Sequence, residues 1–131
     1  MGTVDATSWL AIPEALELHR SLDLSGGLRR HNEQLALAGQ RYLAGMLGVS
    51  RAELWHAAGT SVACVPLRDD VRPDLDAEGL YDLFAAAGAE LAVSDWDGRR
   101  LIRVSGQAYL SPDAMCRVAV TVARALGAAN P

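Results

Sequence analysis

Residues 89–113, AELAVSDWDGRRLIRVSGQAYLSPD, decide the fold. Two short runs rich in apolar residues, 89–93 and 100–104, lie on either side of Asp97-Gly98. This pair is typical of tight turns between antiparallel strands. We therefore expect the two runs to be antiparallel neighbours in one sheet.

Outside this hairpin, the sequence predicts one further strand and four helices. Residues 61–67, SVACVPL, are short and rich in β-branched side chains, as expected of a strand. Pro13 suits the first turn of a helix, and Asp76 and Ser111 suit helix N-caps. The apolar residues repeat at helical spacing over residues 12–22, 28–47, 77–87 and 112–126.

The helix expected over residues 28–47 is amphipathic. Its apolar face includes Leu35, Tyr42 and Leu43, and its charged face includes Gln40. We therefore expect Tyr42 to face the core and Gln40 to face the solvent.

The order of elements predicts the fold class. Helix, helix, strand, helix, hairpin, helix indicates an α+β fold with a small, mostly antiparallel three-stranded sheet and about four helices, packed mainly on one face. The chain has 131 residues, without an internal repeat or a low-complexity tract. Residues 1–131 are therefore expected to form a single domain.

Composition excludes several chemistries. All 12 basic side chains are arginine, so the chain has no lysine for a covalent bond to pyridoxal phosphate or for a P-loop. A net charge of -4 without a basic cluster argues against nucleic-acid binding. The sequence shows no targeting signal and no apolar run of membrane-spanning length. We expect a cytoplasmic protein that binds neither nucleic acid nor a membrane.

Single histidines and cysteines give little sign of a site. His19, His31 and His56 fall on different elements without the spacing of metal ligands, so structural roles are favoured over metal binding. Cys64 and Cys116 are far apart and lie within a predicted strand and a predicted helix. Buried positions are more common for such cysteines than nucleophilic ones.

Arg103 is the candidate that stands out on physical grounds. It lies inside a predicted strand, on the same face as Leu101 and Ser105 and on the opposite face from Ile102 and Val104. A solvent-facing arginine is the commoner explanation for such a position. The alternative is a guanidinium that binds a carboxylate through two parallel hydrogen bonds.

Two separated motifs resemble one enzyme family. Residues 101–109, LIRVSGQAY, followed by Ser-Pro-Asp at 111–113 and a helix, resemble the C-terminal signature of class V aminotransferases. Residues 2–16, GTVDATSWLAIPEAL, are similar to the segment G-T-x-D-x-[ST]-x-x-L-x-x-P-x-A-L of that family. The family consists of fold-type-I pyridoxal phosphate enzymes, including cysteine desulfurases. The resemblance covers essentially the whole chain, most closely the isopenicillin N epimerase-like branch.

The resemblance implies a small domain without its catalytic partner domain. In the family, a large N-terminal domain carries the lysine that binds pyridoxal phosphate. By resemblance, Arg103 binds the substrate carboxylate, while Gly2 and Thr3 contact the cofactor phosphate. This chain is expected to contribute no catalytic residue and no metal ligand of its own.

The sequence also departs from the family pattern. Leu110 follows Tyr109 where members commonly have Asn, which removes a polar side chain just before the last helix. Residues 80–102 contain no cysteine, which argues against the persulfide chemistry of cysteine desulfurases. Epimerase, lyase and aminotransferase chemistry all remain open.

These expectations combine into one hypothesis and two alternatives. The chain is expected to be the small-domain subunit of a split pyridoxal phosphate enzyme acting on an amino acid, in a heterodimer or heterotetramer with a lysine-bearing large-domain subunit. One alternative is a non-catalytic binding or regulatory module; the other is a domain excised from a longer protein. A need for a partner predicts an exposed apolar patch on the two N-terminal helices.

Overall fold

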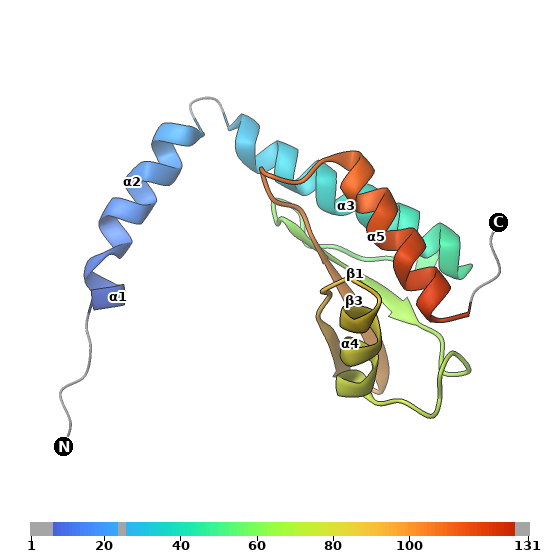
Figure 1. The fold of residues 1–131 in the computed structure, drawn as a ribbon. Helices are drawn as coiled ribbons and strands as arrows, with labels where there is room; N and C mark the ends of the chain where they lie inside the picture. Colours follow the sequence, from blue (N-terminus) through green and yellow to red (C-terminus); the bar gives the residue numbers. More distant parts are fainter. Residues whose placement is uncertain (1–6, 24–25, 128–131) are drawn as a thin grey trace, which may run out of the picture.

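The computed structural model describes residues 7–23 and 26–127 (Figure 1). It is an α+β fold with a three-stranded antiparallel sheet, as the sequence predicts. The elements in chain order are α1 (Thr7–Leu10), α2 (Ile12–Leu22), α3 (Gly27–Leu47), the 3-10 helix η1 (Arg51–Glu53), β1 (Val62–Leu67), α4 (Ala77–Ala86), β2 (Val93–Trp96), β3 (Arg99–Ser105) and α5 (Pro112–Ala125).

The sheet has the strand order β1-β3-β2, and both pairings are antiparallel. Asp97 and Gly98 form the predicted turn, with φ angles of 51° and 69°. Positive values at both positions are typical of a type I′ hairpin turn. The first hairpin strand is 93–96, so its prediction over 89–93 is wrong. A two-residue turn pairs Trp96 with Arg99, which moves the strand toward the turn.

The core lies between one face of the sheet and helices α3 and α5, which pack side by side (Figure 1). Alternate residues of β1 are buried, as a strand with one covered face requires. Helix α4 adds two fully buried side chains to the same cluster. The largest fully buried side chains are Phe84, Leu43, Leu80, Ile102, Val65 and Val122.

Gln40 and Tyr42 each lie on the side of α3 opposite to the one expected from the sequence. Gln40 is only 3% exposed, and Tyr42 is exposed. The Gln40 amide donates hydrogen bonds to the carbonyl oxygens of Cys64 at 2.7 Å and Trp55 at 3.0 Å. A buried amide is stable when it is hydrogen-bonded in this way, so Gln40 joins α3 to β1 and to the segment before it.

Immediately after β3, the backbone of the chain passes very close to the backbone of α3. A Cβ atom on Gly106 would overlap the carbonyl oxygen of Asn32 and lie 2.7 Å from the nitrogen of Ala36. The Gly106 N–H also donates to the Ser61 carbonyl at 2.8 Å, which continues the pairing of β1 with β3. Only glycine allows both contacts at once.

Helices α1 and α2 form an arm that extends away from the body of the domain (Figure 1). Neither helix has a buried residue. The exposed large apolar side chains of the arm are Trp9, Leu10, Ile12, Leu16, Leu18 and Leu22. The only acidic residues within α2, Glu14 and Glu17, lie on the opposite side of that helix from its apolar residues, by helical spacing.

The contact between β3 and α3 gives the first prediction. Gly106→Ala should lower the free energy of unfolding by about 3 kcal/mol or more, because the added methyl group meets backbone atoms that cannot rotate away. The matched control is Gly45→Ala in α3, where a Cβ atom meets no atom within 4 Å. It should stabilise the protein by about 0.5–1 kcal/mol, through helix propensity.

Urea denaturation followed by circular dichroism measures both variants. Equal stability of Gly106→Ala and the wild-type chain would contradict the close approach of Gly106 to α3.

Candidate functional site

Arg103 lies in the middle strand of the sheet, with its side chain on the face that the helices leave open. Its neighbours Ile102 and Val104 are buried and Arg103 is exposed, as the predicted alternation requires, but Leu101, which was expected on the same face as Arg103, is also buried. Its backbone N–H donates to the Ala92 carbonyl at 2.9 Å, and Cys64 is its partner on β1. Within the described residues, Arg103 forms no ion pair. A cation is therefore held on a rigid strand without a fixed counter-charge.

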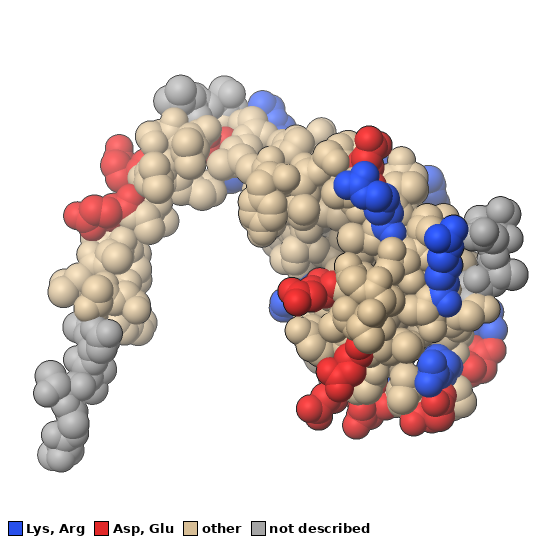
Figure 2. Space-filling view, viewed as in Figure 1, with Lys and Arg blue, Asp and Glu red and all other residues tan. Residues whose placement is uncertain are grey.

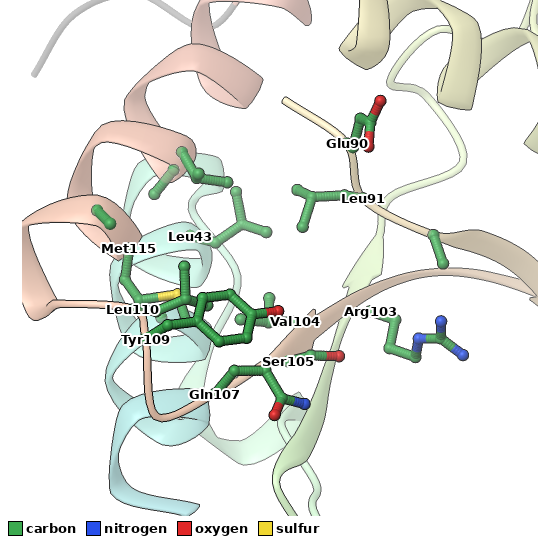
Figure 3. Close-up of a pocket in the computed structure, with 15 residues that line it drawn as sticks. Leu43, Glu90, Leu91, Arg103, Val104, Ser105, Gln107, Tyr109, Leu110 and Met115 are labelled. Atoms are coloured by element: carbon green, nitrogen blue, oxygen red, sulfur yellow. The ribbon is translucent and has the colours of Figure 1, made fainter. Parts of the chain in front are cut away.

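A cleft of about 440 Å³ lies beside Arg103 (Figure 3). Its walls come from α3, α5, the end of β3, the segment 90–92 and the loop after β3. Nonpolar residues form most of the lining: Gly39, Leu43, Leu91, Ala92, Val104, Leu110, Ala114, Met115, Val118 and Ala119. The polar lining residues are Glu90, Arg103, Ser105, Gln107 and Tyr109.

The polar side chains are unevenly distributed around this cleft. Figure 3 shows Ser105, Gln107 and Tyr109 together at one end of it and Glu90 at the other end, beyond Leu91. Arg103 lies at the side of the cleft, and its guanidinium points outward, away from the apolar interior (Figure 3). The arrangement combines an apolar interior with one cation and several hydrogen-bonding groups at the rim.

Arg103 also lines a second, shallower hollow between β2 and α4. Glu78, Tyr81 and Glu90 line the same hollow. Neither carboxylate lies within ion-pair distance of Arg103. An acidic ligand therefore has access to the guanidinium without displacing a protein carboxylate.

The positive charge of Arg103 affects the pKa of the Cys64 thiol. Partial burial raises the pKa of the Cys64 thiol above its ordinary value, and the charge of Arg103 partly offsets this rise. The thiol is therefore mainly protonated at neutral pH. This state agrees with the structural role expected for Cys64 from the sequence.

Two of the three site residues named from the sequence, Gly2 and Thr3, lie outside the described residues. Leu110, the departure from the family pattern, does not leave the last helix uncapped. The Ser111 hydroxyl accepts a hydrogen bond from the Ala114 N–H at 3.2 Å, as its N-cap position predicts.

Sequence reasoning missed Glu90 and Gln107 as neighbours of Arg103. Gln107 carried a detectable signal, because it lies two residues after the strand that holds Ser105. Glu90 carried none, since it was assigned to a strand that begins later. His56 makes a structural contact far from Arg103 in the sequence: its ring Nε2 lies 3.0 Å from the carboxylate of Glu33 in α3.

No protein-family model matches the chain, and a search of curated proteins finds no significant match.

Among residues 7–23 and 26–127, none of the helices combines the length and the apolar character needed to span a membrane. The same residues contain no cluster of three or more potential metal ligands.

The position of Arg103 beside Cys64 gives the second prediction. In a Cys116→Ser background, Arg103→Gln should raise the pKa of Cys64 further, because it removes the positive charge that favours the thiolate. Alkylation by iodoacetamide at mildly alkaline pH should slow accordingly. The pH dependence of the alkylation rate measures this shift.

Arg117→Gln is the matched control, since Arg117 is exposed on α5 and does not line the cleft. It should leave the alkylation profile of Cys64 unchanged. An identical profile for Arg103→Gln and the parent would show that the guanidinium does not act on this thiol.

Proposed function

We propose that this chain is the small-domain subunit of a split pyridoxal phosphate enzyme, in which Arg103 binds the carboxylate of an amino-acid substrate. The observation that carries the proposal is the guanidinium of Arg103, exposed beside a cleft and without an ion pair among the described residues. The resemblance of residues 2–16 and 101–113 to class V aminotransferases supplies the enzyme class.

Arg103 acts by binding and orientation. A guanidinium presents parallel N–H donors that match the two oxygens of a carboxylate. Because β3 is the central strand and pairs on both sides, its backbone position is fixed. A carboxylate held there restricts the substrate to a few orientations, which lowers the entropic part of the activation barrier.

The described residues do not by themselves provide a complete site for the cofactor. Residues 1–131 contain no lysine, so the proposal places the lysine that binds the cofactor outside them. Gly2 and Thr3, the proposed phosphate contacts, lie outside the described residues. When bound by the complete enzyme, the cofactor supplies the electron sink for reactions at the substrate Cα. The role proposed for this chain in the complete enzyme is substrate binding.

The arm supports the need for a partner. The apolar face of α2 is exposed along the length of the helix, although a helix of this kind normally buries that face. Figure 2 shows acidic side chains on the side of the arm that points away from the body. The expected patch is confined to α1 and α2, because α3, the second of the two expected N-terminal helices, belongs to the core.

One observation favours the second candidate function, a non-catalytic binding module. The described residues of this chain form an apolar cleft of about 440 Å³ beside Arg103, which offers a small carboxylate a site of its own. The two functions differ in whether a lysine-bearing subunit binds the arm.

Co-expression with a lysine-bearing large domain encoded beside this chain tests the proposal. The two polypeptides should co-purify and bind pyridoxal phosphate, and the complex should turn over members of a panel of amino acids. Arg103→Gln should raise KM by about 10- to 100-fold, because a charged pair is lost, while cofactor absorbance is unchanged. Arg117→Gln should leave KM unaltered.

A matched pair of variants in α2 tests whether the arm binds the partner. Leu22→Glu places a charge on the apolar face of α2, whereas Ser21→Glu places it on the polar face of the same turn. The first should abolish co-purification and the second should preserve it. Failure of the unmodified polypeptides to associate would sink the split-enzyme proposal and favour the binding module.

A further inference from the structure

Arg103 could bind a carboxylate without the apolar cleft that lies beside it. We infer that it holds the apolar part of the ligand whose carboxylate binds Arg103, so that this chain selects apolar carboxylates. The inference deepens the proposed function and rests on it only for the role of Arg103. The chemical class is a carboxylate that carries an apolar hydrocarbon group, such as an amino acid with an apolar side chain.

The interior of the cleft is apolar on several sides. Leu43 comes from α3, Met115 and Val118 come from α5, and Leu91 comes from the segment before β2. The volume of about 440 Å³ is within the range of small-molecule sites. Hydrocarbon that enters this space leaves water, which is the main source of affinity for an apolar group.

The base of the cleft is closed by close packing at Gly39. A Cβ atom there would lie 2.8 Å from Cγ1 of Val104 and 3.1 Å from Sδ of Met115. Helix α3 therefore contacts β3 and α5 too closely for a ligand to pass between them. The hydrocarbon is bounded by this base, and the only charged groups of the lining are Arg103 and Glu90.

The rim determines where the charged end of the ligand lies. Ser105, Gln107 and Tyr109 offer hydrogen bonds at one end, and Figure 3 shows Glu90 at the opposite end. An anion is attracted to Arg103 and repelled by Glu90. A carboxylate on the Arg103 side, with its hydrocarbon in the cleft, satisfies both conditions.

Titration of the full chain with straight-chain carboxylates, from propionate to octanoate, tests the inference by ¹H–¹⁵N NMR. Affinity should increase by up to about fourfold for each added methylene until the cleft is filled. Residues that line the cleft should show the largest shifts. Octanol, which lacks the charge, should bind more weakly than octanoate.

Variants assign the binding to this cleft. Ala114→Phe fills the cleft and should abolish binding of octanoate, while Ala86→Phe, which adds the same group at an exposed site on α4, should not. Arg103→Gln should weaken octanoate about tenfold. Glu90→Gln should strengthen it, because a like charge is removed.

Three results would overturn the inference. The first is affinity for octanoate no greater than for propionate, which leaves the carboxylate role of Arg103 standing. The second is equal affinity for octanol and octanoate. The third is the absence of saturable binding that Ala114→Phe abolishes, because binding at the competing exposed apolar face of α2 would survive that change. None of these measurements involves the partner, so they fail separately from the split-enzyme proposal.

Discussion

The close approach of Gly106 to the backbone of α3 is the constraint on which the rest of the domain depends. It brings the end of the central strand into contact with the helix that covers it, where a side chain would overlap Asn32. The chain then turns into the loop that carries Gln107 and Tyr109. The contact thus positions the loop that forms one wall of the cleft.

Local signals in the sequence predicted most of the fold. Asp97-Gly98 determined the hairpin, and Asp76 and Ser111 were correctly assigned as N-caps. The errors arose where tertiary contacts outweigh local pattern. Gln40 is polar, yet it is buried because its amide donates hydrogen bonds to two carbonyl groups, one in β1 and one just before it. The first hairpin strand was misplaced because turn geometry, rather than hydrophobicity, fixes its register.

The site was only partly accessible from the sequence. Period-2 alternation was enough to place Arg103 on the open face of the sheet. The cleft was not foreseeable, since four separate segments of the chain line it and meet only in the folded domain. Glu90 had no local signal, because its role depends on where the polypeptide runs between α4 and β2. Motif resemblance suggested a carboxylate ligand, whereas packing alone defined the apolar space beside it.

The central claim is that Arg103 is a carboxylate-binding group rather than a solvated strand arginine. The Nε–Hε resonance of each arginine, followed by NMR while octanoate is added to the full chain, tests this directly. The account predicts a saturable shift for Arg103 and no saturable shift for Arg117 or Arg124, which are exposed on α5. Equal, non-saturating shifts at all three arginines would contradict it.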